Sequence, residues 1–458
     1  MSRPVSRLVC AGCGAGPPPS DPYPFRCRNA GRDDDVDHVL RRELDLAALE
    51  FPPADHEPDP FLRYRPLLHA YHLGLSDDGF CALVRRLDLR VAEVDGHGFR
   101  VTPFERSDEL SDLLGFRRAG GVWVKDETGN VSGSHKARHL FNVLVHLEAA
   151  EQLGLTDPAN RPELAIASCG NAALAAAVVA RAGGRALRVF VPVDADPVVL
   201  ERLEQLGARV EICERTDEPG DPTYRRLLRA LDEGALAFTC QGNLNGLAVE
   251  GGQTLGYELA TSGVPLDRLV VQVGGGALAS ACAHAFREAA ALGAVAATPR
   301  LDTVQTEGAW PLKRAFDAVA ARGDLAYAAS HRSEFMWPWE REPRSVAHGI
   351  LDDETYDWLA VVEGMLGTGG TPLVVSEERL VEANERAVEA TGIDVDPTGS
   401  AGLAGLLALR EAGAVGDEER VGVLFTGVRR AAGPRPRRQD DEELSGTRHP
   451  VAEGVRAR

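Results

Sequence analysis

Short apolar runs alternate with longer alanine- and leucine-rich stretches from residue 89 onward. The runs VWVKDE, ELAIAS and LRVFVP are each followed by a segment long enough for a helix. Apolar strands that alternate with helices indicate βα units, in which helices cover a parallel sheet. The pattern therefore predicts the α/β fold class with a mostly parallel sheet. Ligands of such sheets bind at the carboxyl ends of the strands, so chemistry is expected in the loops that follow these runs.

The two ends of the chain depart from this pattern. Residues 1–35 are rich in Cys, Gly, Pro and Asp and predict a small irregular module. Residues 33–50 predict a helix, and the proline-rich segment FPPADHEPDP marks a boundary before the main body. Residues 431–458 mix Pro, Arg and acidic residues without periodicity, which predicts a disordered tail.

The chain is acidic, with 69 Asp and Glu against 50 Lys and Arg and a net charge of −19. It has no long basic run, so the charge argues against a nucleic acid or an anionic membrane as partner. A small-molecule ligand is favoured. The first residues lack the apolar stretch of a signal peptide, and no segment has the features of a transmembrane helix. We therefore expect a cytoplasmic protein.

Lysine is rare in this chain, and one lysine occupies a chemically informative position. The 50 basic residues include three lysines, Lys125, Lys136 and Lys313. Arginine keeps its proton and cannot form an imine, whereas lysine can attack a carbonyl. Lys136 follows a Gly/Ser loop and starts a predicted helix, where the helix dipole disfavours a protonated amine. It is suited to a Schiff base with an aldehyde cofactor such as pyridoxal phosphate. Lys125 lies inside a strand beside acidic residues and is expected to form an ion pair.

A glycine-rich loop follows the apolar strand VVQV. The loop contains Gly274, Gly275 and Gly276 and passes directly into a helix that begins with Ala277 and Leu278. Glycine lets backbone N–H groups approach an anion, and the start of the helix faces it, so the loop predicts a phosphate site. An ordinary glycine turn is the alternative.

Polar side chains follow three other predicted strands. Asn171, in ASCGNAA, stands where its amide can donate to a phenolate oxygen or simply cap a helix. Thr426 ends the last apolar strand and offers an uncharged hydroxyl to a neutral pyridine nitrogen, or only forms a turn. Ser132, Ser134 and Ser168 are candidates to bind a substrate carboxylate, with helix capping as the alternative for the first two.

In their order and spacing, these pieces resemble the type II fold of pyridoxal-phosphate enzymes, most closely the threonine synthase branch, over about residues 100–430. SGSHKAR resembles the lysine motif TGSFKDR of that family, SCGNAA resembles its STGNT-like loop, and FTGVRR resembles its strand ending in TGHGLK. The resemblance implies that Lys136 holds pyridoxal phosphate, that Asn171 bonds the phenolic oxygen and that Thr426 faces the ring nitrogen. The phosphate would lie against Gly274 through Leu278.

The resemblance also implies two open, mostly parallel sheet domains and a homodimer. The large, cofactor-binding domain would comprise residues 95–140 and 243–430, and a small mobile domain residues 141–242. Residues 1–94 would form a small cysteine-containing extension, and residues 431–458 the tail.

Several positions depart from the family pattern. GNLNGLA keeps Asn245 but has Ala248 where the family binds a substrate phosphate through Arg, which argues against O-phosphohomoserine. Ala172 replaces the Thr that follows the loop Asn. His135 before the lysine is similar to the HK pair of the tryptophan synthase β chain, where the histidine lies near the phosphate. A structural role at the helix start is the alternative.

Three cysteines near the N-terminus form an incomplete metal motif. Cys10 and Cys13 give CxxC, and Cys27 follows. A structural zinc needs four ligands, and Asn29 or Ala30 stands where many threonine synthase modules have the fourth cysteine. His38 can complete the set. Zinc binding and free thiols in a small loop are both consistent with this spacing.

The leading hypothesis is a pyridoxal-phosphate-dependent lyase or synthase, similar to threonine synthase. It would act by β- or γ-elimination or replacement on a small amino acid. A hydroxyl rather than a carboxylate at the ring nitrogen favours elimination over transamination. The alternatives are a serine or threonine dehydratase (ammonia-lyase), and a non-catalytic regulatory protein that binds pyridoxal phosphate or zinc.

Overall fold

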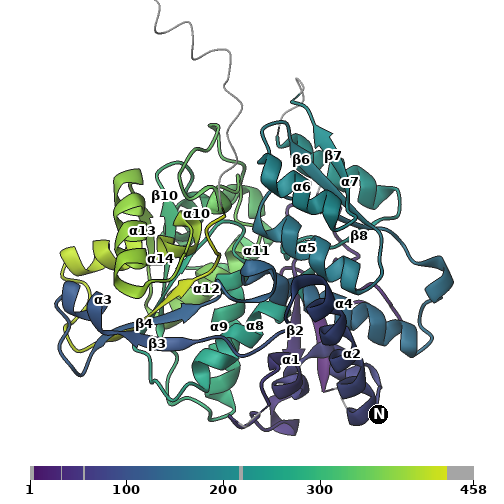
Figure 1. The fold of residues 1–458 in the computed structure, drawn as a ribbon, viewed down its shortest axis with the longest axis horizontal. Coiled ribbons are helices and arrows are strands. Elements are labelled where there is room, and N and C mark those ends of the chain that lie inside the picture. The colour runs from purple at the N-terminus through teal and green to yellow at the C-terminus, as the bar shows by residue number, and fades with distance from the viewer. Residues whose placement is uncertain (1–4, 32–33, 55–56, 216–219, 431–458) are drawn as a thin grey trace, which may run out of the picture.

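The computed structural model describes residues 5–31, 34–54, 57–215 and 220–430. The predicted disordered tail, 431–458, lies outside the described residues. Within them, the chain forms a large sheet, a smaller sheet and an N-terminal strand pair. Figure 1 shows the smaller sheet and its helices as a teal lobe beside the larger, green-to-yellow lobe. The predicted α/β fold class with mostly parallel sheets is confirmed.

The large sheet has six strands in the order β11-β10-β9-β12-β4-β3. The antiparallel edge strand is β3 (Phe104–Ser107). The parallel strands are β4 (Gly121–Asp126), β9 (Arg268–Gln272), β10 (Arg300–Thr306), β11 (Pro372–Val375) and β12 (Arg420–Phe425). Every residue of β9 is buried, as expected for a central parallel strand covered by helices on both faces.

The small sheet has four parallel strands in the order β7-β6-β5-β8. They are β5 (Leu164–Ala167), β6 (Leu187–Pro192), β7 (Arg209–Cys213) and β8 (Leu236–Ala237). These strands fall within the segment predicted for the small domain, and the domain limits themselves stay a prediction.

Helices fill the connections between the strands. They are α1 (Pro60–Arg63), α2 (Asp77–Asp95), α3 (Asp108–Leu113), α4 (Lys136–Gln152), α5 (Asn171–Ala182), α6 (Pro197–Gln205), α7 (Pro222–Asp232), α8 (Gly246–Ala260), α9 (Ala277–Ala291), α10 (Pro311–Arg322), α11 (Leu325–Ser330), α12 (Trp358–Thr368), α13 (Glu377–Thr391) and α14 (Pro397–Glu411). Short 3₁₀ turns are η1 (Leu46–Ala48), η2 (Arg65–Leu67), η3 (His69–Leu73), η4 (Val131–Gly133), η5 (Pro158–Asn160), η6 (Arg332–Glu334) and η7 (His348–Ile350). Within the described ranges, every helix is too short or too polar to cross a bilayer.

The N-terminal extension corrects one prediction. Instead of a helix over residues 33–50, β2 (Leu40–Leu44) pairs antiparallel with β1 (Ser6–Cys10). Leu40 and Arg42 are both buried, so the strand alternates with period two. The sequence does not show this alternation of buried and partly exposed positions, because one of the buried positions is occupied by an arginine, Arg42. Arg42 contacts Glu250 and Glu288 of the main body, at 3.1 and 2.9 Å.

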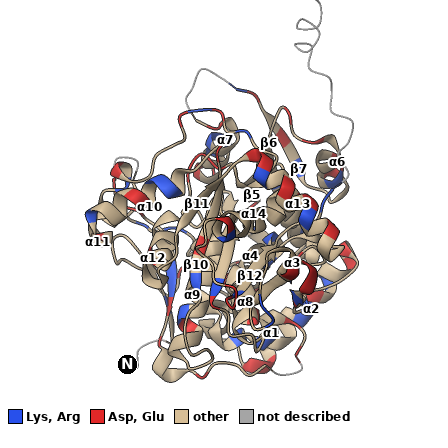
Figure 2. Ribbon diagram, turned by 90° about the vertical axis from the view of Figure 1, so that its left-hand side faces the viewer, with Lys and Arg blue, Asp and Glu red and all other residues tan. Residues whose placement is uncertain are grey.

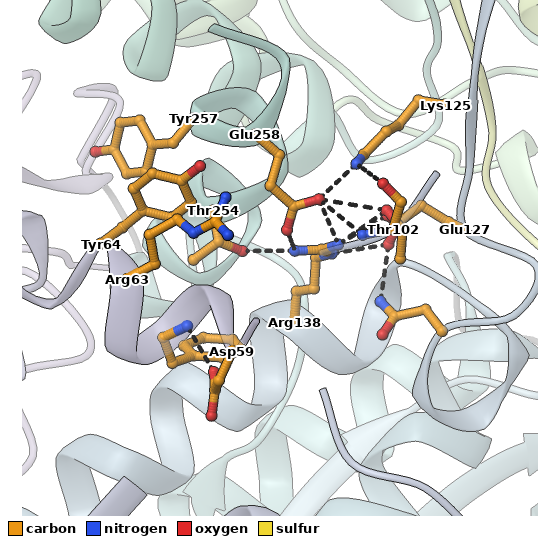
Figure 3. Close-up of polar contacts among 12 residues, drawn as sticks. Asp59, Arg63, Tyr64, Thr102, Lys125, Glu127, Arg138, Thr254, Tyr257 and Glu258 are labelled. Carbon is orange, nitrogen blue, oxygen red and sulfur yellow. Dashed lines mark hydrogen bonds and ion pairs between the residues drawn. The ribbon is translucent and has the colours of Figure 1, made fainter. Parts of the chain in front are cut away.

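A buried ionic cluster joins β4, α4 and α8. Arg138 lies between Glu127 and Glu258, with its nitrogens 2.8 and 2.6 Å from their oxygens (Figure 3). Lys125 approaches Glu258 at 2.5 Å, which confirms the ion pair expected for this lysine. Burial alone would raise the pKa of Glu258, but Arg138 and Lys125 outweigh it and hold that pKa below its usual value. Elsewhere, basic positions are interleaved with acidic ones (Figure 2).

Replacing Arg138 by methionine should strongly destabilise the fold. Two buried glutamates would lose a partner, which typically costs about 3–5 kcal/mol. The half-exposed pair Arg7–Glu43 provides the control, and Arg7→Met should cost less than about 1 kcal/mol. Urea unfolding of both variants measures the two free energies. Equal losses would show that the cluster does not hold these elements together.

Candidate active site

Three adjacent parallel strands bring the predicted site loops together. In the large sheet, β12 lies between β9 and β4. Their carboxyl ends therefore open at one edge of the sheet. The glycine loop follows β9, Thr426 follows β12, and the loop of Lys136 follows β4. An isolated bridge between Ser134 and Gly427 ties two of these loops directly.

The lysine loop has a strained turn and unpaired hydroxyls. Among the described residues, Ser132 is the non-glycine residue with positive φ, at +56°. Such backbone conformations are held by their surroundings and concentrate at functional sites. Ser132 and Ser134 are buried, and neither Oγ has a hydrogen-bond partner within the described chain. Lys136 is the first residue of α4 and is half-buried, and its Nζ forms no hydrogen bond or ion pair with the described residues.

Thr426 is held in a defined hydrogen-bonding role by Gln272. The buried Gln272 amide donates to Thr426 Oγ1 at 2.8 Å and to the Gly399 carbonyl at 2.7 Å. Since the Thr426 hydroxyl accepts this bond, its own proton is available to another acceptor. An unprotonated pyridine nitrogen is such an acceptor.

Asn171 belongs to the part of the chain that forms the small sheet, and its side chain lies beside Gly427, next to Thr426. It starts α5, directly after the loop that follows β5. A Cβ on Gly427 would lie 2.6 Å from Asn171 Nδ2, so the amide lies against the backbone next to Thr426. Its Oδ1 accepts from Arg430 at 3.0 and 3.2 Å. On the same loop, Ser168 Oγ accepts a hydrogen bond from the Gly170 N–H at 3.4 Å. Ser168 and Asn171 are both partly exposed.

The glycine loop is packed against an acidic segment, residues 350–357. A Cβ on Gly274 would clash with Asp352, and one on Gly275 would lie 3.0 Å from the ring of Tyr356. The Asp357 N–H donates to the Gly275 carbonyl at 2.9 Å. Glycine is therefore required here because backbone and side chains approach closely, and Ala277 and Leu278 continue the loop into α9.

Two carboxyl groups of this segment lie near Lys136. Burial raises the pKa of Asp352 to about 6, with Lys136 and a hydrogen bond from Gly275 acting in the opposite direction. Burial raises the pKa of Asp357 to about 7, where a hydrogen bond from Gly242 and the charge of Lys136 oppose it. The pKa of His135 lies well below its usual value because the ring is buried, so the imidazole is neutral. Its Nδ1 lies 3.2 Å from the Thr426 carbonyl oxygen.

Some positions singled out in the sequence have structural partners instead. Ala248 is fully buried, and its carbonyl oxygen lies 2.7 Å from His139 Nδ1. Asn245 caps α8 through its bond to Leu247. Sequence reasoning missed Gln272, although a polar residue inside an apolar strand was a usable signal. It also missed Asp352, for which no local pattern gives a signal.

The N-terminal cysteines lie together with a histidine. One donor atom from each of Cys10, Cys13, Cys27 and His38 lies within 4.8 Å of all the others. Asp34 Oδ2 lies 2.6 Å from His38 Nε2, which leaves Nδ1 to face Cys10 at 3.4 Å. All eight cysteines are free, so no disulfide occupies this cluster.

The donor set at the sheet edge suits a coenzyme with an aldehyde, a pyridine ring and a phosphate. An unpaired amine, a hydroxyl with a proton to donate, and a glycine loop at a helix start meet there. A sequence profile of the family described as "Pyridoxal-phosphate dependent enzyme" matches residues 97–427.

Known proteins with related sequences agree with this match. Threonine synthase of Methanosarcina acetivorans is 28% identical over 333 residues, which are 71% of this chain and 74% of that protein. The L-threo-3-hydroxyaspartate ammonia-lyase of a Pseudomonas species is 26% identical over 310 residues, covering 67% and 84%. Among solved structures, a threonine deaminase from the organism abbreviated T.th. superposes with a TM-score of 0.56 at 25% identity, covering 77% of this chain and 99% of the other.

Proposed function

Because the chain belongs to the family of pyridoxal-phosphate dependent enzymes, we propose that it catalyses elimination or replacement at Cβ or Cγ of a small amino acid. The observation that carries the proposal is the meeting of Lys136, Thr426 and the glycine loop at one sheet edge, with Asn171 brought to them from the small sheet. The threonine synthases and the ammonia-lyase among its relatives support this reaction class.

Each site residue has a distinct part in this proposal. Bound pyridoxal phosphate supplies a ring that stabilises negative charge at the substrate Cα. Lys136 would be the residue that holds the aldehyde group, and its amine would move the proton at the substrate Cα. The Thr426 hydroxyl would donate a hydrogen bond to the ring nitrogen and keep its own proton, so that the nitrogen stays uncharged. Asn171 donates to the phenolic oxygen, and the N–H groups of Gly274 through Leu278 hold the phosphate.

The serines are proposed to bind the substrate carboxylate. Ser134 Oγ and Ser132 Oγ are buried without a partner among the described residues, so a ligand there would satisfy them. Ser168 lies on the loop before Asn171 and would bind the same carboxylate. The homodimer and the cytoplasmic location expected from the sequence stay predictions.

Borohydride reduction of the loaded protein, followed by peptide mapping, tests the attachment point. We expect the pyridoxyl group on Lys136. Lys136→Ala should lose the covalent chromophore, whereas Lys313→Ala should keep it, because Lys313 is on α10 and pairs with Asp317. A pyridoxyl group on Lys125 would contradict the site. Labelling of Lys136 without Cα proton exchange in any amino acid would favour the non-catalytic alternative.

The carboxyl groups near the proposed site affect which leaving group it would favour. Cys169 is an exposed residue in the loop before Asn171, and its thiol pKa is raised by desolvation from the surrounding protein and by the nearby carboxylates of Asp194 and Asp221. Asp353 has a pKa raised to about 6 by burial, by Asp221 and by Glu354. Carboxylates from both sheets therefore face this region. This observation favours an uncharged hydroxyl leaving group, as in an ammonia-lyase, over the phosphate of O-phosphohomoserine.

Comparing 2-oxo acid formation from threonine with phosphate release from O-phosphohomoserine tests this second candidate. We expect kcat/KM for threonine to be higher by roughly tenfold or more, because a phosphate dianion is repelled by these carboxylates. Asp221→Asn should narrow the difference, and Asp317→Asn on α10 should leave it unchanged. Preferential phosphate release would instead assign the threonine synthase reaction.

We also propose that Cys10, Cys13, Cys27 and His38 bind a structural zinc ion. Tetrahedral zinc with bonds of about 2.0–2.3 Å holds its ligand atoms roughly 3.3–3.8 Å apart. The Cys10–His38 and Cys13–Cys27 distances are 3.4 and 3.6 Å. Asp34 would orient the histidine through its other ring nitrogen, as carboxylates commonly do at zinc sites.

Metal analysis of the purified protein by mass spectrometry tests the zinc site. We expect about one zinc per chain, lost in Cys27→Ser and in His38→Ala because three ligands do not close a structural site. Cys213→Ser is the control, because Cys213 is a buried cysteine of β7. Metal-free protein in which the three clustered thiols all react with a thiol reagent would refute the site.

A further inference from the structure

The acidic segment places a carboxyl group on the loop that is proposed to bind phosphate. Asp352 is partly buried, and its carboxylate lies beside Gly275, whose backbone N–H acts to lower the pKa of the carboxyl. Its Oδ2 lies so close to Gly274 that a Cβ there would clash, and it would lie 3.7 Å from a Cβ on Gly275. A phosphate bound to this loop would therefore lie beside a carboxyl group.

The surroundings of Asp352 contain more negative than positive groups. Lys136 is the cation that faces it, from the start of α4. Asp353, from its own segment, and Asp221, at the start of α7, face it with negative charge. The Tyr356 hydroxyl lies in the same field, and the pKa of Tyr356 is raised well above its usual value by burial and by Asp352. A bound phosphate would add about one and a half to two negative charges here.

Two anions that lie side by side in a partly buried site favour a state in which one of them takes a proton. We propose that Asp352 is a ligand of the coenzyme phosphate in its protonated form, its carboxyl O–H donating to a phosphate oxygen. Binding would then take up one proton from solvent, with no other bond made or broken. This inference rests on the proposed function, because it requires the phosphate to lie on Gly274 through Leu278.

The pH dependence follows from linkage. The Asp352 pKa in the free chain is about 6. If the coenzyme binds the protonated carboxyl, its affinity is greatest below that pH and falls as the pH rises above it. Asparagine at this position keeps the shape and an N–H donor but cannot titrate. In Asp352→Asn, the part of the fall in coenzyme affinity that is due to Asp352 should therefore disappear.

The test measures binding of pyridoxine 5′-phosphate to the coenzyme-free protein by calorimetry. This probe has the phosphate and the ring but no aldehyde, so no bond to Lys136 contributes protons. From pH 6.5 to 8.5, the wild-type affinity should fall by roughly tenfold or more relative to that of Asp352→Asn. At pH 7.5, heats in two buffers of different ionisation enthalpy should show uptake of about one more proton by the wild type than by the variant.

Glu354→Gln is the matched control on the same segment. Its partner is Arg332, and it should keep the wild-type pH dependence. Asp352→Ser provides the same comparison if the asparagine variant does not fold. Equal pH dependence and equal proton uptake in the wild type and the Asp352 variants would overturn the proposal. If the wild type binds neither this probe nor pyridoxal phosphate at Lys136, the proposed function itself fails and this inference falls with it.

Discussion

The double ion pair of Arg138 is the interaction on which the site geometry depends. Arg138 stands two residues after Lys136, so whatever fixes its guanidinium also fixes the first turn of α4. Glu127 follows β4 and Glu258 lies on α8, and their carboxylates meet the same arginine at 2.8 and 2.6 Å. Buried charges are tolerated only when paired in this way. The cluster therefore fixes the position of Lys136 at the sheet edge without contacting the Lys136 side chain.

The glycine loop, Gly274 to Gly276, has two structural roles: it presents backbone N–H groups, and it gives room for another segment to pack against it. Its backbone N–H groups and the start of α9 make it suited to bind an anion. Its missing side chains also let residues 350–357 pack directly onto it. The identity and charge of that segment then influence whatever binds the loop. In this chain, the segment contributes the carboxyl groups of Asp352, Asp353 and Asp357, so the surroundings of the loop are acidic.

Local sequence order predicted the βα architecture and the loops around Lys136, Asn171 and Thr426, because each loop directly follows an apolar strand. The strand Leu40–Leu44 was mistaken for part of a helix, because its buried Arg42 interrupts the apolar pattern. The hydrogen bond from Gln272 to Thr426 forms because β9 and β12 are neighbours in the sheet. These strands are far apart in the sequence, so no local pattern predicts that they pair. The contact of Asp352 with Gly274 joins segments far apart in the chain, and no periodic pattern reports it.

The strand pair β1–β2 takes part in the core of the main body, because Arg42 of β2 supplies a buried positive charge there. Glu250 of α8 and Glu288 of α9 both face its guanidinium. A truncated chain that begins after β2 would retain these two acids in its interior and lose that counter-charge. The burial of these two acids therefore depends on a strand that lies upstream of residues 97–427, the segment that the family profile matches.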